Sequence, residues 1–184
     1  MALLTLDEAK AQLDITTDSE DAELQAYIDA LTAPIERHVG PVEIRTVTEV
    51  VNGRAALVLT QVPVVSLTSL TPLTTGGTAI GAGDVFVDND SGVVHRVDCG
   101  QFAGGPWTAV YEAGRGEVPP TINLAARILL QHLWRTQYGA SRGLSGIGGG
   151  EDFSVNEPIA GWGYAIPNRV LQLLEPYKAP PGVA

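Results

Sequence analysis

The sequence has few of the side chains that bind metals or carry out redox chemistry. It contains one cysteine, Cys99, and three histidines, His38, His95 and His132, among 184 residues. A single cysteine forms no internal disulfide, and it has no second thiolate with which to hold a metal ion. The histidines are far apart in the sequence, and no two have the spacing of a helical metal-binding pair. We therefore predict no cofactor, no metal site and no redox activity.

Basic residues are also scarce. The chain has 11 lysines and arginines against 21 aspartates and glutamates, which gives a formal net charge of −10. This sign disfavours a broad surface that grips a phosphate backbone, so we do not expect a protein that reads a nucleic-acid sequence. The same sign suits a surface that nucleic acid passes without sticking, because like charges repel over a Debye length of about 8–10 Å.

Long apolar runs are missing as well. No stretch has the apolar length of a membrane span, and the first residues, MALLTLDEAK, lack the basic start and apolar centre of a signal peptide. We expect a soluble, cytosolic protein without a membrane partner. Apolar residues make up 45% of the chain, enough for one domain with a real core, and the 21 glycines and 12 prolines indicate turn-rich and tail-like parts beside it.

The clearest helical pattern runs from Val118 to Gly139. Two prolines precede it, Thr121 is expected as its N-cap, and Gly139 is expected as the left-handed residue that ends it. An apolar stripe with helical spacing consists of Ile122, Ala125, Ala126, Leu129, Leu130 and Leu133. We predict one helical core cluster made of Leu24, Ile28, Leu31, Leu129 and Leu133.

The N-terminal part of the chain has the pattern of two helices. Thr5 and Glu8 form a capping-box motif at the start of the first helix. Asp18 or Ser19 is the expected N-cap of the second helix, and the helix dipole explains the acidic residues that follow. Pro34 is expected to kink this second helix, and a Gly-Pro pair is expected to stop it.

After the second helix the apolar period changes to two, which is typical of half-buried strands. A strand over Ile44–Val50 is expected to pair with Ala56–Leu59 through a turn at Asn52-Gly53. The fold class is therefore α+β: a small helical bundle with an inserted antiparallel β-sheet or barrel. The predicted parts are an N-terminal helical part (1–41), the β region (42–117), a central core helix (118–139), and a Gly-rich loop and C-terminal arm with a short helix (140–184).

The C-terminal arm begins with the segment ASRGLSGIGGG, which has too little apolar content to hold one conformation, so we predict a flexible loop. Apolar side chains farther along the arm are costly to leave in water. At about 25 cal/mol per Å², a few of them would contribute several kcal/mol on docking. The arm residues that we predict to form a subunit or partner interface are Trp162, Tyr164, Ile166, Val170, Leu173 and Leu174.

Two motifs are similar to functional sites but lack essential parts. Ser141 lies in a G-x-S-x-G sequence, yet a nucleophile elbow needs a strand before it, a helix after it and a later histidine, and all three histidines come earlier. Asp88 and Asp90 imitate the first half of a calcium loop, but the position of its bidentate glutamate falls on Cys99. We predict no catalytic residue and an idle Ser141. For Asp88 and Asp90 a strand-to-strand turn is favoured, with ion binding as the open alternative.

Two stretches of the sequence together are similar to a known family. The first, Leu4 to Gly40, follows the start LLTLDEAKAQLDI with the acidic break DSEDAEL and the helix end ERHVG. The second, Val110 to Tyr138, contains VYEAGRGEVPPTINLAARILLQHLW, in which a Tyr-x-Ala-Gly turn leads into the long helix. This layout resembles the head-to-tail connector (adaptor) proteins of long-tailed double-stranded DNA bacteriophages.

That resemblance implies a structural subunit of the phage neck and not an enzyme. It implies a homo-oligomeric ring, with twelve subunits expected, that binds the portal protein at the capsid vertex and offers a platform to the next neck or tail protein. Genomic DNA would pass through the ring without sequence-specific binding, which agrees with the acidic charge. The implied location is the neck of the virion, after synthesis in the host cytoplasm. Either the C-terminal arm or the β region, Glu43–Ala113, would carry the portal contact.

Three other functions remain as alternatives. A tail-completion or stopper protein of the same neck would share the β region but lack the N-terminal helix pair. A ligand-binding β module would use exposed aromatic side chains on strand loops, for which Trp107, Trp162 and Tyr164 are the candidates. A hydrolase is the third alternative, and the order of the histidines disfavours it.

Overall fold

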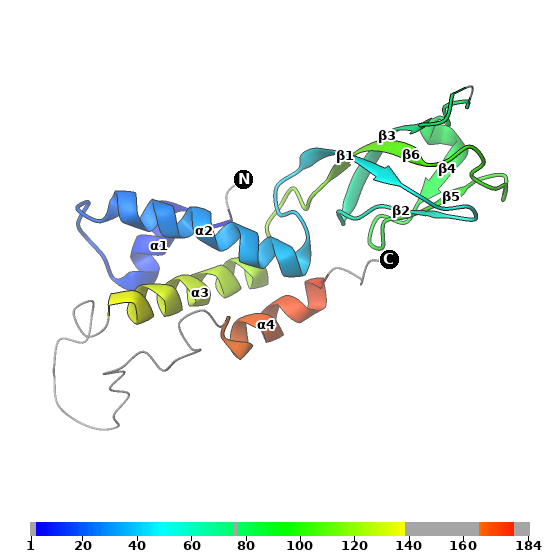
Figure 1. The fold of residues 1–184 in the computed structure, drawn as a ribbon. Coiled ribbons are helices and arrows are strands. Elements are labelled where there is room, and N and C mark those ends of the chain that lie inside the picture. The colour runs from blue at the N-terminus through cyan, green and yellow to red at the C-terminus, as the bar shows by residue number, and fades with distance from the viewer. Residues whose placement is uncertain (1–2, 76, 139–165, 179–184) are drawn as a thin grey trace. The chain divides into compact units, whose positions relative to one another are not determined.

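The computed structural model describes residues 3–75, 77–138 and 166–178. The chain divides into two units, each with its own elements (Figure 1). The helical unit takes its described residues from 2–34 and 119–176, and the β unit takes them from 35–118 together with 177 and 178. The combination of helices and antiparallel sheets confirms the α+β class predicted from the sequence.

Four α-helices form between the two ends of the described chain: α1 (Leu6–Leu13), α2 (Asp21–Val39), α3 (Pro120–Tyr138) and α4 (Asn168–Leu174). A short 3-10 helix, η3 (Glu175–Tyr177), follows α4. Both α1 and α4 contact α3 (Figure 1). Among the residues that the structure describes, no helix combines the length and apolar character needed to cross a membrane.

The start of α1 confirms the predicted capping box. The Thr5 side chain accepts a hydrogen bond from the Glu8 N–H, while the Glu8 carboxylate accepts one from the Thr5 N–H. These bonds satisfy two backbone donors that have no partner within the helix. The helix then ends at Asp14, a left-handed residue with φ 57°, whose N–H donates to the Lys10 carbonyl.

The predicted N-caps of the two long helices are wrong. Helix α3 begins at Pro120, so Thr121 lies inside its first turn, and the N–H groups of Ile122 and Asn123 both donate to the Pro119 carbonyl. Proline at the first helical position has a preset φ and no N–H to leave unpaired, which makes it a better start than threonine. The residue expected to end α3, Gly139, is outside the described residues.

Helix α2 begins at Asp21, so Asp18 and Ser19 both lie ahead of its capping position. Asp18 instead forms an ion pair with Lys10. The Nζ atom of Lys10 lies 2.7 Å from Asp18 Oδ1 and 2.8 Å from Asp21 Oδ1. At the other end, Gly40 has φ +79° and its N–H donates to the Glu36 carbonyl at 2.8 Å, so the predicted stop at this glycine is confirmed.

The core of the helical unit confirms most of the predicted apolar stripe. From α2 the buried side chains are Leu24, Ile28 and Leu31, and from α3 they are Ile122, Ala125, Ala126, Leu129 and Leu130. Leu133 is only partly buried, and Trp134 is buried in its place, with its ring 5.4 Å from that of Tyr27 in an edge-to-face pair. Trp134 follows Ala126 and Leu130 at steps of four, so the stripe continues along this row of the helix.

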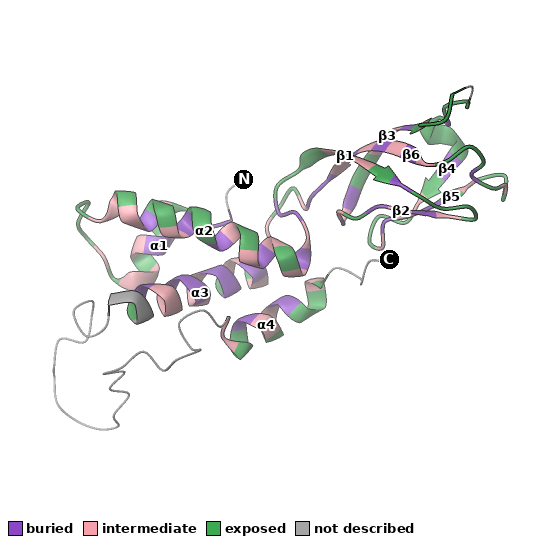
Figure 2. Ribbon diagram, viewed as in Figure 1, coloured by how far each residue is buried: buried purple, intermediate pink, exposed green. Residues whose placement is uncertain are grey.

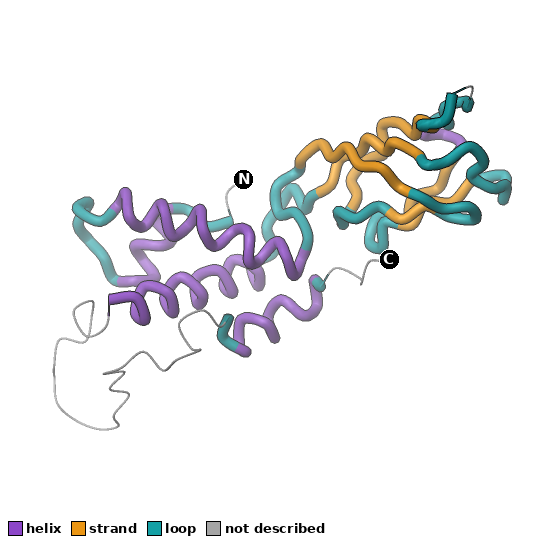
Figure 3. The backbone as a smooth tube through the Cα atoms, in the orientation of Figure 1, coloured by secondary structure: helices purple, strands orange, loops and turns teal. Residues whose placement is uncertain are grey.

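The β unit contains six strands in two antiparallel sheets (Figure 3). Sheet A has the order β1-β6-β3, and sheet B has the order β2-β5-β4. The strands are β1 (Arg45–Val51), β2 (Leu57–Val58), β3 (Val64–Pro72), β4 (Val85–Val87), β5 (Val93–Arg96) and β6 (Trp107–Ala113), with a 3-10 turn, η1 (Ala82–Asp84), before β4.

The hairpin expected at Asn52-Gly53 does not form. Strand β1 pairs along its whole length with β6, from Arg45 opposite Ala113 to Val51 opposite Trp107. Strand β2 pairs with β5 in the other sheet. Long-range pairing therefore overrides the local turn signal, because β6 buries every second side chain and needs a strand on each side.

Both sheets of the β unit face one apolar core (Figure 2). The buried members of this core are Val51, Leu57, Leu59, Val62, Val64, Leu70, Ile80, Val85, Val94, Phe102, Trp107, Ala109, Tyr111 and Ala113. Tyr111 brings a polar atom into it, and its hydroxyl donates to Glu49 Oε1 at 2.8 Å and accepts from the Gln61 N–H at 3.0 Å. The polar end of the tyrosine is thus satisfied at the margin of the core, and the other faces of the two sheets point outward.

Candidate functional site

The residues considered for metal binding or catalysis do not assemble into such a site in the described structure. Within residues 3–75, 77–138 and 166–178, no group of three or more His, Cys, Asp or Glu side chains is placed to hold a metal ion. Cys99 is an exposed free thiol. Ser141 lies outside the described residues, so its predicted idleness stays a prediction.

Asp88 has a role in the turn that joins β4 to β5. Its Oδ2 accepts a hydrogen bond from the Ser91 hydroxyl at 2.6 Å, and its Oδ1 accepts one from the Asp90 N–H at 3.3 Å. The bond from Ser91 is the main reason that the pKa of Asp88 is below its ordinary value. Gly92, with φ +71°, completes the turn. The preferred interpretation, a strand-to-strand turn, is confirmed.

Trp107 is unsuitable as an exposed aromatic platform for a ligand. Its side chain is 2% exposed and lies edge-to-face with Phe102, with the ring centres 6.0 Å apart. The ligand-binding alternative loses this candidate. The other two, Trp162 and Tyr164, lie outside the described residues.

The predicted interface residues of the C-terminal arm fall into three groups. Val170 and Leu174 are buried, with exposed fractions of 0% and 2%, on a helix that contacts α3 of the same chain. Ile166 and Leu173 are partly buried and keep some exposed surface. Trp162 and Tyr164 are outside the described part. Two of the six side chains therefore already have a partner within the chain.

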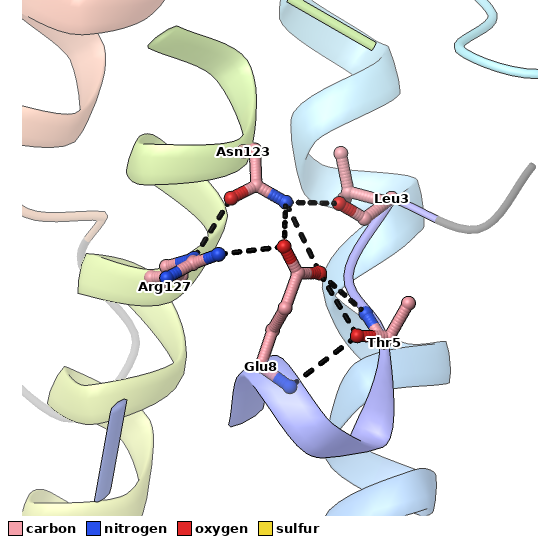
Figure 4. Close-up of polar contacts among 5 residues, drawn as sticks. All are labelled: Leu3, Thr5, Glu8, Asn123 and Arg127. Carbon is pink, nitrogen blue, oxygen red and sulfur yellow. Dashed lines mark hydrogen bonds and ion pairs between the residues drawn. The ribbon is translucent and has the colours of Figure 1, made fainter. Parts of the chain in front are cut away.

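A polar cluster joins the start of the chain to α3 (Figure 4). Glu8 is its centre, and Figure 4 shows its carboxylate turned toward Thr5 on one side and toward Asn123 and Arg127 on the other. The carboxylate accepts bonds from the Thr5 N–H at 2.9 Å and from Arg127 Nη2 at 2.6 Å. The same glutamate therefore caps α1 and holds it to α3.

Asn123 and Arg127 complete the cluster from α3. The Asn123 amide donates to the Leu3 carbonyl at 3.2 Å, and its oxygen accepts from Arg127 Nε at 2.8 Å. Leu3 and Leu4 are both buried, so the polar cluster fixes the apolar N-terminal segment against the helical unit. The sequence revealed only the capping half of this arrangement. The missed signal was the i, i+4 spacing of Asn123 and Arg127 beside the apolar stripe.

The polar cluster predicts an acid-dependent contribution to stability. The backbone hydrogen bond from Thr5 is the largest cause that holds the pKa of Glu8 below its ordinary value. A carboxylate with a lowered pKa in the folded state stabilises that state above its unfolded pKa, and this contribution is lost as the pH falls through the folded pKa. Glu8→Gln keeps a capping side chain but removes the charge, and should lower the free energy of unfolding at pH 7 by about 0.5–1 kcal/mol.

Urea unfolding of wild type and Glu8→Gln from pH 7 to pH 3 measures this contribution. The difference between the two proteins should shrink as the pH falls. Asp7→Asn is the matched control, because Asp7 is an exposed carboxylate in the same turn outside the polar cluster. Equal stability of wild type and Glu8→Gln across the whole range would contradict the assigned role of Glu8.

Arg115 connects the segments through which the chain enters and leaves the β unit. Its Nη2 donates to the carbonyls of Val39 at 2.8 Å and Tyr177 at 3.1 Å, and its guanidinium carbon lies 5.3 Å from the centre of the Tyr177 ring. Burial is the main reason that the pKa of Arg115 is lowered from its ordinary value. The side chain thus ties the last residue of α2 and the last residue of η3 to the loop that follows β6.

Most of the exposed apolar surface in the described structure belongs to the β unit. The large apolar side chains with high exposure are Ile44, Val50, Val65, Leu73, Phe86 and Val97 in the β unit and Leu124 in the helical unit. Phe86 is the one aromatic side chain in this set and is 62% exposed. The β unit therefore contains most of the exposed large apolar side chains of the described residues.

Comparison with known proteins gives one family and several solved structures. A family model described as head completion protein matches residues 2–179. Among curated proteins, none matches this chain. The fold is similar to a chain in the neck of an empty gene transfer agent (GTA) particle, computed with C6 symmetry, with a TM-score of 0.64 and 17% identity over 99% of this chain and 92% of the other.

Two further structures have the same fold. One is a chain in the neck of the native GTA particle, computed with C12 symmetry, with a TM-score of 0.62 and 18% identity over 97% of this chain and 90% of the other. The second is a chain in the virion of the native GTA particle, with a TM-score of 0.60 and 17% identity over 99% and 92% of the two chains. The identities are low, so these structures establish the shared fold.

Proposed function

Because this chain belongs to the head completion protein family, we propose that it is a structural subunit of a phage-type neck, where it joins the DNA-filled head to the tail. The observation that carries the proposal is the match of the family model to residues 2–179, which include both units of the fold. The family is one of structural proteins, and the proposal assigns the chain no catalytic activity. Its place is the neck of the virion.

The proposal includes a ring of identical subunits on the portal protein. Neck chains with this fold occur in particles computed with C6 and C12 symmetry, which supports a ring, with twelve subunits expected. The helix pair α1 and α2 favours the adaptor over the tail-completion or stopper alternative, which would lack it. The net charge of −10 suits a ring through which DNA passes without specific binding.

Capsids that carry a portal but lack this protein test the proposal directly. After addition of the purified protein, electron cryomicroscopy should show added density on the portal with cyclic symmetry. A downstream neck or tail protein should then bind only to capsids that carry this ring. Capsids without a portal are the control. Binding that is equal with and without a portal, or absent from both, would contradict the proposal.

The C-terminal arm is the proposed portal contact, and its described candidates are Ile166 and Leu173. A variant with Ile166→Ser and Leu173→Ser should occupy fewer portal sites, because apolar surface lost from a contact weakens it. Its melting temperature should change little, since both side chains are only partly buried. Leu124→Ser is the control, because Leu124 is 45% exposed on α3. If the double variant still occupies all portal sites, the portal contact would have to be assigned to the β unit.

A further inference from the structure

The outward side of sheet B carries an apolar surface with one histidine at its centre. Phe86 on β4 lies directly opposite His95 on β5, and both side chains are exposed. Their chain neighbours Val85 and Val94 are buried in the core, so the alternation along each strand turns Phe86 and His95 outward. We call this surface the B face, and it consists of Val58, Phe86, Val93, His95 and Val97.

The outward side of sheet A carries a nearly uncharged surface of small side chains. Its three strands align in three rows, and we call this surface the A face: Thr46, Glu112 and Ser66, then Thr48, Val110 and Ser69, then Val50, Thr108 and Thr71. Glu112 is the single charge among these nine residues, and its Oε2 accepts a hydrogen bond from the Ser66 hydroxyl at 2.9 Å. In the row farthest from Glu112, the apolar side chain of Val50 is 58% exposed.

The A face and the B face lie on opposite sides of the β unit, because both sheets bury their other sides in one core. Two different faces on opposite sides of one unit are what a head-to-tail contact requires, and repetition of such a contact by rotation closes a ring. From this arrangement we propose that the B face of one subunit packs against the A face of the next, with His95 donating a hydrogen bond to Glu112. The inference rests on the ring of the proposed function.

Polar complementarity favours a second copy of this chain as the partner that packs against the B face. The B face offers one N–H donor among apolar side chains, and the A face offers one carboxylate among hydroxyl and methyl groups. An imidazole N–H bonded to a carboxylate satisfies both groups in a contact that otherwise buries few charges. A partner with a basic surface would instead meet five side chains on the B face that include no acid.

The size of the faces determines how strong the contact is. Strands lie about 4.8 Å apart and successive outward residues about 6.7 Å apart, so three rows on three strands cover roughly 300 Å². Stable interfaces bury about 800 Å² on each partner. The contact between the two faces therefore provides only part of the subunit interface, and a single substitution should weaken the ring and not abolish it.

Chemical cross-linking tests which faces meet. Cys99 is the only cysteine, so Cys99→Ser gives a chain without thiols in which new pairs of thiols are unambiguous. In that background, Phe86→Cys together with Val110→Cys, assembled on portal-bearing capsids and treated with a short bismaleimide, should give a ladder of covalent multimers. Each single-cysteine chain should stay monomeric on a denaturing gel, because head-to-tail packing puts different residues opposite each other.

Charge exchange tests the polar pair. Glu112→Lys removes the acceptor, and His95→Glu places a carboxylate opposite Glu112, so each should reduce the number of rings on portal-bearing capsids by about tenfold. The double variant should recover most of the loss, since it restores an opposite pair across every contact. Both positions are on outward faces, so melting temperatures of all variants should stay near that of the wild type.

The possible outcomes separate this inference from the proposed function. A ladder together with recovery in the double variant supports it. Rings of Cys99→Ser that give no ladder, or single-cysteine chains that stop at dimers, would overturn the pairing of the two faces while leaving the neck function intact. If neither the wild type nor Cys99→Ser forms a ring on portal-bearing capsids, the ring itself is absent, and both proposals fall.

Discussion

Leu130→Ala should lower the free energy of unfolding by about 2–5 kcal/mol, which is a large part of the stability of a typical domain. Leu130 is 0% exposed on α3, next to the buried residues Ala126 and Trp134. Its truncation removes apolar contacts and leaves a cavity that the surrounding helices fill only in part. Thermal unfolding followed by far-ultraviolet circular dichroism should show a clearly lower melting temperature.

The control for this substitution lies on the same helix. Leu124 is 45% exposed, so Leu124→Ala should change the free energy of unfolding by less than about 1 kcal/mol. Both variants remove the same side-chain atoms from α3. The difference between their free energies of unfolding therefore reports the effect of burial. Equal melting temperatures for the two variants would mean that α3 presents a different side to the core.

Leu174→Ala should have an effect of the same size, about 2–5 kcal/mol, although it lies close to the end of the described chain. Leu174 is 2% exposed and Val170 is 0% exposed, and they lie four residues apart on α4, which contacts α3. A helix as short as α4 gains little from its own backbone bonds, so these side chains provide most of what holds it. Loss of one should release α4 as well as destabilise the core.

Leu173→Ala is the matched control, because Leu173 is adjacent to Leu174 and only partly buried. It should leave the unfolding curve close to that of the wild type. Hydrogen exchange of the α4 amides gives a second measurement, and protection should fall in Leu174→Ala and persist in Leu173→Ala. Protection that is equal in the two variants would show that α4 does not depend on the buried leucine.

The burial of α4 side chains changes how the arm can be studied. A chain cut after Tyr138 would remove Val170 and Leu174 and would expose the apolar part of α3 that they cover. Such a protein would lose stability whether or not the arm binds the portal. Point substitutions at Ile166 and Leu173 separate the two effects, since these side chains contribute less to the core.

Local signals were sufficient to predict that the helices form, although the N-caps predicted for α2 and α3 were wrong. The capping box of Thr5 and Glu8 marks the start of α1, Gly40 marks the end of α2, and the apolar stripe marks α3. These features depend on bonds and contacts between residues within four positions of each other, so the sequence pattern contains them. The shift from Leu133 to Trp134 in the core follows from packing, because Tyr27 of α2 offers an aromatic partner.

The pairing of strands could not be predicted in the same way. An Asn-Gly pair favours a two-residue hairpin, yet β1 pairs with β6, whose residues follow it by more than fifty positions. Strand β6 is central in sheet A because its inward residues Trp107 and Tyr111 fill the core from one side. That preference comes from the assembled core and has no short-range signature.

The candidate interaction surfaces were predictable only in part. The apolar residues of the arm were identified by composition, but Val170 and Leu174 are buried within the chain. The A face and the B face depend on which strands are neighbours, and so the pairing of Phe86 with His95 could not be seen before the register was known. Arg115 was missed for a similar reason, since its partners Val39 and Tyr177 come from two distant segments of the chain.

The bonds made by Arg115 have a consequence for the order of events during folding. The helices α1 and α2 are synthesised first, and α3 follows only after residues 35–118 of the β unit. Arg115 bonds to the Val39 carbonyl across 76 positions of sequence, so a folded β unit holds together the two points where the chain enters and leaves it. Closing a flexible loop of that length costs about 4 kcal/mol in chain entropy. If residues 35–118 fold on the ribosome, this entropy cost is met before α3 is synthesised.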